Sequence, residues 1–429
     1  MVKQNGGAHA IVGAVNSSTP QPKRPAPTHR DSGRAGAVHK STICPVTEVM
    51  ATLRKPARVF HLSTMMLLTL GALRECEATI RHVPTNYPAI QLALSASSPN
   101  DTILVAPGVY FENLNAGDKF VSIIGPGGAD NTVVDGQAAG RCLRLGDGGR
   151  LSGLTFRNGY VSTDGGGIWV RVNDSTRPFE MDGCRLIENV VGFPDQGRGG
   201  GLYITCFVIG VKVTNCRFER NQAGLLGGGA YGCAGTLEDN VFIDNYAWHA
   251  GGGLDGGGEI ARRNLFIGNT ARNVGGGYYG SPRLLENNTF VNNHHQNVFS
   301  LGAGIHVKEG GVVKKNIVIG STGIGNTGVG IYFNHSGMLE GTPELSCNDS
   351  WGNSGPNFYV AGMVDTVGHN NFSLDPQFCH PQSMNFSLGA ASPCAGGYAG
   401  CGLIGALGVG CQPITVESAT WSRIKTLLN

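Results

Sequence analysis

Aromatic and ionisable residues recur at one position of a glycine-marked repeat, and this pattern is where the sequence could do chemistry. Four places after the first glycine of successive repeats stand Trp169, Tyr203, Tyr231, Asp255, Tyr279, His306 and Tyr332. Exposed aromatic side chains in line can stack on sugar rings with a large contact area. Asp255 could serve as an acid, a base or a cation ligand, with His249 and His306 as helpers. The pattern predicts a polysaccharide-binding face, with Asp255 and His249 as candidate catalytic residues.

Other functions fit the same row of residues. Aromatic rows on parallel sheets also stabilise one another without binding anything. Glycoside hydrolysis generally needs two carboxylates around one bond, whereas Tyr231 and Tyr279 occupy this position on either side of Asp255. Polysaccharide binding is therefore our first hypothesis. The alternatives are a polysaccharide lyase-like enzyme acting on an acidic polysaccharide, and a structural surface protein or adhesin. We expect no cofactor, with calcium considered only for a lyase.

The glycine triplets that mark these positions are part of an internal repeat. They begin at residues 165, 199, 227, 251 and 275, and related motifs begin at 302 and 328. In the regular repeats of 24 residues, Asn240, Asn264 and Asn288 are each followed two places later by phenylalanine. Repeats of this length with short apolar runs cannot bury their apolar side chains alone, but stacked coils can. The repeat predicts an all-β parallel β-helix with glycine and asparagine at its corners.

The residues before the repeats fit the same architecture. A short helix is expected over 88–96, followed by strands in DTILVAPGVY (101–110), VSIIG (121–125) and TVVDG (132–136). This stretch resembles the opening coils of secreted right-handed parallel β-helix proteins of the pectin-lyase-like superfamily, and the resemblance covers roughly residues 79–411. It implies a right-handed solenoid with an N-terminal capping helix. It leaves the activity open, because the superfamily includes lyases, hydrolases, esterases and adhesins.

The charge distribution argues against nucleic acid as a partner. The chain has a formal net charge of +2, but residues 1–78 hold ten basic and four acidic residues. The remainder holds 22 basic and 26 acidic residues, so the repeat region is slightly acidic. It contains no basic stripe of the kind that nucleic-acid binding requires. We therefore expect a glycan partner and no nucleic acid.

The N-terminal region carries features of a targeting sequence. Residues 1–49 are rich in small, polar and basic residues and are expected to be a disordered extension, or to result from a misassigned start, since Met50 opens the next segment. Residues 50–78 have the basic, apolar and polar layout of a signal peptide. Their apolar run, 62–73, is too short to span a bilayer, and a buried helix is the alternative interpretation. The prediction is a secreted or cell-surface protein with no transmembrane segment in the mature chain.

Cysteines are expected to pair in an oxidising compartment. Cys184 and Cys216 occupy equivalent positions on adjacent coils, as Cys206 and Cys233 nearly do, so each pair is a disulfide candidate. The remaining candidates are Cys379, Cys394, Cys401 and Cys411. These four are expected to close the last coils. No cysteine pair has metal-site spacing, so no metal site is expected.

The C-terminal part is expected to divide into two segments after the β-helix of residues 79–371. Residues 372–412 are predicted to form terminal coils and a disulfide-rich cap. In the tail, 413–429, Trp421, Ile424 and Leu427 have helical spacing. A short helix docked on the open end of the β-helix is one interpretation, and a sorting or attachment tail is the other. We expect the protein to be a monomer.

Overall fold

The computed structural model describes residues 78–192, 194–206, 210–232, 235–336, 342–362 and 369–411, and the structural statements below concern these residues. They belong to the second of two units into which the chain divides, Ala72–Asn429. The predictions for 1–49, for 50–77 and for 413–429 lie outside the described residues, as do Cys233 and the side chain of Cys206.

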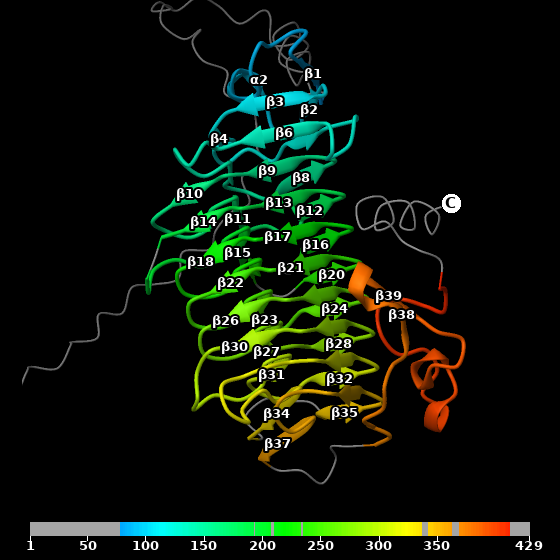
Figure 1. Ribbon diagram of the computed structural model, residues 1–429. Coiled ribbons are helices and arrows are strands. Elements are labelled where there is room, and N and C mark those ends of the chain that lie inside the picture. The colour runs from blue at the N-terminus through cyan, green and yellow to red at the C-terminus, as the bar shows by residue number, and fades with distance from the viewer. Residues whose placement is uncertain are drawn as a thin grey trace, which may run out of the picture. The chain divides into compact units, whose positions relative to one another are not determined.

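The described chain winds into stacked coils, and each coil adds one strand to each of several parallel sheets (Figure 1). Sheet A contains β1 (Ile80–Val83), β2 (Thr102–Val105), β5 (Ser122–Ile124), β8 (Gly149–Ser152), β12 (Phe179–Asp182), β16 (Val211–Thr214), β20 (Thr236–Glu238), β24 (Ile260–Arg262), β28 (Leu284–Glu286), β32 (Val312–Lys314) and β35 (Glu344–Ser346). Sheet B contains β3 (Gly108–Phe111), β6 (Thr132–Asp135), β9 (Thr155–Arg157), β13 (Arg185–Ile187), β17 (Arg217–Glu219), β21 (Val241–Ile243), β25 (Leu265–Ile267), β29 (Thr289–Val291), β33 (Ile317–Ile319) and β36 (Asp349–Trp351).

Two further sheets complete the coils. Sheet C contains β4 (Leu114–Asn115), β7 (Leu143–Leu145), β11 (Ile168–Val172), β15 (Leu202–Cys206), β19 (Ala230–Tyr231), β23 (Leu254–Gly257), β27 (Tyr278–Ser281), β31 (Ile305–Val307), β34 (Ile331–His335) and β37 (Phe358–Gly362). The shorter sheet D contains β10 (Tyr160–Val161), β14 (Val190–Val191), β18 (Gln222–Ala223), β22 (Tyr246–Ala247), β26 (Thr270–Ala271) and β30 (His294–His295). This topology confirms the predicted all-β parallel β-helix.

The interior shows why the 24-residue repeat folds this way. Phe218, Phe242, Phe266 and Phe290 stack one above another in sheet B, with ring centroids 4.4–4.7 Å apart. At the corner before them, Asn264 Oδ1 accepts hydrogen bonds from the backbone N–H and the side-chain amide of Asn240, both at 3.0 Å. Its own Nδ2 donates to the Leu237 carbonyl at 2.9 Å. Each asparagine therefore satisfies buried corner groups that no strand can satisfy.

A glycine triplet precedes five strands of sheet C, β11, β15, β19, β23 and β27, for a backbone reason. Gly251 has a φ of +66°, in the left-handed region, and a Cβ there would lie 2.8 Å from the backbone nitrogen of Asp255. The next two residues face carbonyl groups of the following coil, since a Cβ on Gly252 would lie 2.5 Å from the Gly276 oxygen. In this coil glycine therefore fits the tight turn into sheet C without strain.

A short helix lies at the N-terminal end of the coils, where the sequence predicts one. Helix α2 (Ile90–Ala96) buries Ile90, Ala93 and Leu94. The Glu112 carboxylate accepts hydrogen bonds from the backbone N–H groups of Ile90 and Gln91, at 2.9 and 2.8 Å. These bonds satisfy donors that the first turn of a helix leaves free.

The C-terminal segment packs against the outer face of sheet B. The antiparallel pair β38 (Phe378–His380) and β39 (Asn385–Leu388) is followed by short 3-10 turns, and Phe386 packs with Val241, Ile267 and Val291. Disulfides join Cys347 to Cys401 and Cys379 to Cys411, so the C-terminal region is disulfide-linked as predicted. The prediction that four cysteines close the last coils needs correction. Cys394 is a free, buried thiol, and Cys347 takes part instead.

The predicted Cys184–Cys216 disulfide is not formed. Both cysteines are buried and free, although they lie on adjacent coils as expected. The backbone N–H of Cys184 points at Cys216 Sγ, 3.4 Å away, and Cys216 N–H donates to Asn240 Oδ1 at 2.9 Å. The two thiols thus occupy the position that asparagine takes in later coils.

Candidate functional site

The residues singled out in the sequence form one continuous file on the outer side of sheet C. Strand register pairs each with its neighbour in the order Arg144, Trp169, Tyr203, Tyr231, Asp255, Tyr279, His306, Tyr332 and Tyr359. The residue before each of the seven predicted members is buried in the core, as alternation along a strand requires. Arg144 and Tyr359 extend the file by one coil at each end. We refer to these nine residues as the sheet C file.

Most rings of the sheet C file stack on one another. The Tyr203 and Tyr231 rings lie 5.4 Å apart with an interplanar angle of 7°, and Tyr332 and Tyr359 lie 5.4 Å apart at 9°. Stacked rings turn their faces toward each other, so the file presents ring edges and phenol groups outward. This corrects the expectation of open aromatic platforms, because a sugar ring stacks on a face rather than an edge.

Asp255 interrupts the stack. The sequence predicts that its side chain is exposed, but the structure buries it. Its side chain has a tyrosine on each side and only 6% of the residue is exposed. Burial raises the pKa of Asp255 to about 8, with Glu259 acting in the same direction and Lys308 and Arg198 in the opposite one. Its Oδ2 atom has no hydrogen-bond partner among the described residues. The structure therefore places a protonated carboxyl group at the centre of the file near neutral pH.

Three cations that the repeat position does not predict lie over rings of the file. The guanidinium groups of Arg144 and Arg198 lie 4.9 Å from the Trp169 ring centroid and 5.2 Å from the Tyr231 centroid, respectively. Lys308 Nζ lies 5.1 Å from the Tyr279 centroid. The repeat position does not predict Arg198 or Lys308, because Arg198 precedes a glycine triplet and Lys308 follows His306 by two residues. Together they put positive charge on both sides of Asp255.

A second buried carboxyl group lies inside the coils next to this strand. The Tyr278 hydroxyl donates to Glu259 Oε1 at 2.5 Å, and Glu259 Oε2 has no partner among the described residues. Burial raises the pKa of Glu259. Gly256 makes room for this carboxyl group, since a Cβ there would lie 2.6 Å from it. The one sequence signal for Glu259 is an acidic residue directly after a second glycine triplet.

The two predicted helper histidines differ in their surroundings. His306 is part of the stack, with its ring 4.4 Å from Tyr332, and its Nδ1 lies 2.8 Å from the Leu301 carbonyl. Burial lowers the pKa of His306 to about 4, so its ring is neutral. His249 is exposed in the turn before its glycine triplet. Within the described residues no hydrogen bond joins it to Asp255, so the geometry does not support a helper role for His249.

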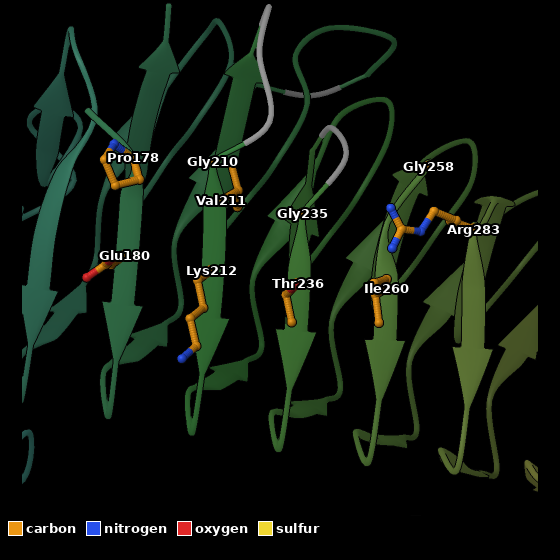
Figure 2. Close-up of a pocket in the computed structure, with 10 residues that line it drawn as sticks. All are labelled: Pro178, Glu180, Gly210, Val211, Lys212, Gly235, Thr236, Gly258, Ile260 and Arg283. Carbon is orange, nitrogen blue, oxygen red and sulfur yellow. The ribbon is translucent and has the colours of Figure 1, made fainter. Parts of the chain in front are cut away.

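A separate hollow of about 350 Å³ lies on the outer face of sheet A (Figure 2). Its lining residues are Pro178, Glu180, Gly210, Val211, Lys212, Gly235, Thr236, Gly258, Ile260 and Arg283. Three glycines at the start of successive strands leave the space, and no file member lines it. We call it the sheet A hollow.

The described residues contain no group of three or more histidine, cysteine, aspartate or glutamate side chains placed to hold a metal ion. None of their helices is long and apolar enough to cross a membrane.

Comparison with known proteins adds little to this geometry. No protein-family model and no curated protein matches the sequence. One similar solved structure is a crystal structure of a pectin methylesterase mutant in complex with hexasaccharide IV. It has 12% sequence identity and a TM-score of 0.26, and the match covers 69% of this chain and 89% of that chain. Such a match carries no functional argument. By its own sheet topology the chain is a parallel β-helix protein, the fold that the resemblance to the pectin-lyase-like superfamily implies.

Proposed function

We propose that this protein is a secreted or cell-surface β-helix protein that binds polysaccharide along the sheet C file. The supporting observation is the file itself, which places aromatic edges, hydroxyl groups and cations in one line over consecutive coils. An extended chain could follow such a line and contact several coils at once. The disulfides Cys347–Cys401 and Cys379–Cys411 are consistent with an oxidising compartment.

The cations favour an acidic polysaccharide over a neutral one. Arg198 and Lys308 lie over tyrosine rings beside Asp255, and neither forms an ion pair with it. The Asp255 carboxyl group holds its proton near neutral pH, so it adds no repelling charge. It can donate a hydrogen bond instead. A carboxylate or sulfate on the glycan would then meet two cations and one donor.

A glycan array with double variants tests binding along the file. Tyr231→Ala combined with Tyr279→Ala should remove most of the signal, because both residues flank Asp255. The matched control is Tyr160→Ala, an exposed tyrosine on sheet D that is not part of the file. If the double variant binds the array like the unmodified protein, the file is not the binding face. If neither protein binds any glycan, a structural surface protein or adhesin becomes the better hypothesis.

A lyase-like enzyme acting on an acidic polysaccharide is the second candidate, and one observation favours it. Asp255 combines burial with a strongly raised pKa beside two cations, and such perturbed groups cluster at catalytic sites. Uronate polymers should be assayed for unsaturated products by absorbance, with and without calcium. Turnover that is lost in Asp255→Asn while glycan binding persists would establish this candidate. If no polymer yields an unsaturated product, the lyase-like candidate is excluded and polysaccharide binding remains the proposed function.

A further inference from the structure

The sheet C file lacks a ring at Asp255, in the middle of its aromatic residues. Tyr203 and Tyr231 stack with their ring centroids 5.4 Å apart on one side of Asp255. Tyr279 and His306 have their centroids 5.2 Å apart on the other side. The Asp255 side chain ends at its carboxyl group, so it does not reach as far outward as the tyrosine rings that flank it. The file is thus an aromatic stack in which one layer is missing.

The missing layer has the thickness of one ring. Tyr231 lies on β19 and Tyr279 on β27, and the Asp255 strand β23 is paired between them. Neighbouring strands lie about 4.8 Å apart, so the two strands that carry these tyrosines are separated by about 9.6 Å. This separation is close to twice the spacing of 4.4–5.4 Å between the other tyrosine and histidine rings of the file. A planar ring inserted there would lie about 4.8 Å from each tyrosine, within the range of stacked aromatic pairs.

The floor of this gap is a polar group without a partner. Only 6% of Asp255 is exposed, and its Oδ2 atom has no hydrogen-bond partner among the described residues. Nearly all buried polar atoms in folded proteins are paired, so an unpartnered carboxyl oxygen on the outer side of a strand points to a bound group. Burial also raises the pKa of Asp255 to about 8, which keeps the carboxyl group protonated and able to donate a hydrogen bond.

Two cations lie at the sides of the gap. The Arg198 guanidinium lies 5.2 Å from the centroid of the Tyr231 ring, and Lys308 Nζ lies 5.1 Å from the centroid of the Tyr279 ring. Neither cation forms an ion pair with another described residue. Their long side chains can move as a ligand enters and can then pair with its negative charge. The gap therefore combines two aromatic walls, a hydrogen-bond donor and positive charge.

We propose that this gap binds a small planar aromatic acid, whose ring stacks between Tyr231 and Tyr279. The carboxylate of the ligand pairs with Arg198 and Lys308, and a hydroxyl group on its ring accepts a hydrogen bond from Asp255. A molecule such as 4-hydroxybenzoate carries these two groups at opposite ends of one ring. The inference goes beyond polysaccharide binding and does not depend on it, because the ligand is a small molecule that occupies a single layer of the file.

Calorimetric titration of the full chain with 4-hydroxybenzoate near neutral pH tests this proposal, and saturable binding at one site is expected. Cyclohexanecarboxylate has the same charge without a flat ring, and 4-hydroxybenzyl alcohol has the ring without the charge. Each should bind about tenfold more weakly than 4-hydroxybenzoate. Equal binding of all three molecules, or no saturable binding of 4-hydroxybenzoate, would overturn the proposal.

The variant Asp255→Tyr locates the site, because it supplies the missing ring and fills the gap. It should abolish binding of 4-hydroxybenzoate, whereas glycan binding along the rest of the file is read separately on the array. Tyr160→Ala is the control, since Tyr160 is exposed on sheet D and lies outside the file. This control should bind the acid as the unmodified protein does. Undiminished binding by Asp255→Tyr would show that the acid does not occupy the gap.

A charge variant keeps the test valid if Asp255→Tyr disturbs folding. Arg198→Gln combined with Lys308→Gln removes both cations and leaves the aromatic walls and Asp255 in place. Binding of 4-hydroxybenzoate should weaken about tenfold, while binding of the uncharged alcohol should not change. An equal loss for both ligands would mean that the two cations only support the structure, and no loss would place the acid elsewhere. Either result contradicts the proposal.

Discussion

The phenylalanine stack inside sheet B and the aromatic file outside sheet C are built by the same coil-to-coil register, yet they differ in regularity. Four identical phenylalanine rings stack at 4.4–4.7 Å without a break. The outer file changes residue type at nearly every step and is interrupted by Asp255. Core packing tolerates few alternatives, whereas an outer position is free to vary. A buried acid in the outer file is therefore not required by packing, which favours a functional role.

The largest expected effect lies in the phenylalanine stack. Phe266 is fully buried between two rings. Phe266→Ala should lower the free energy of unfolding by about 4 kcal/mol, because the cavity would persist between rigid coils. Urea denaturation followed by circular dichroism measures it. Phe111→Ala, at a largely exposed position on the same sheet, is the control and should change stability by less than about 0.5 kcal/mol. Equal losses of unfolding free energy in the two variants would mean that the phenylalanine stack stabilises the fold no more than an exposed position does.

The asparagine corner beside that stack should be nearly as sensitive. Asn264→Ala leaves the Asn240 N–H and the Leu237 carbonyl without their partners. We expect a loss of about 3 kcal/mol in the free energy of unfolding, since both groups stay buried. The same denaturation experiment applies, with exposed Asn326→Ala as the control. A loss as small as that of the control would mean that water replaces the asparagine.

Asp255 in the sheet C file should make the stability of the protein depend on pH. The folded protein keeps the Asp255 proton up to about pH 8, while the unfolded chain releases it near the ordinary value of 3.8. Stability therefore falls as pH rises through this window, by about 2 kcal/mol between about pH 6.5 and about pH 9. Asp255→Asn should remove this decrease. His306 acts oppositely, because its lowered pKa costs stability only as pH falls from 6.5 toward about 4. An unchanged slope in Asp255→Asn would show that Asp255 is ionised when folded.

The smallest effect is expected for a single ring of the file. Tyr332 is half-buried and stacks between His306 and Tyr359. Tyr332→Ala should cost only about 1 kcal/mol of unfolding free energy, the order of one aromatic pair. Thermal denaturation of this variant beside Phe266→Ala gives the comparison directly. A loss of similar size in both would make the outer file a structural ladder and weaken the binding proposal.

Much of the fold could be predicted because it follows from the repeat period. The asparagine, phenylalanine and glycine positions recur every 24 residues in the regular coils, and each has the same role in every coil. The order of the residues in the sheet C file also followed from this period. The burial of Asp255 could not be predicted from it, because that burial depends on tyrosines from two other coils. The predicted Cys184–Cys216 disulfide also failed, since equivalent positions on adjacent coils bring the two thiols into contact but both stay free.

By itself, the sequence determined the stacked parallel coils and which residues share a file, since both follow from a period that applies to every coil. Only the tertiary structure decided how each file meets its surroundings. It buried Asp255, brought Arg198 and Lys308 over neighbouring rings, and laid the C-terminal segment on sheet B. The physical reason is that burial and electrostatics depend on side chains from different coils and from outside the repeat, and their directions are not encoded in any spacing along the chain.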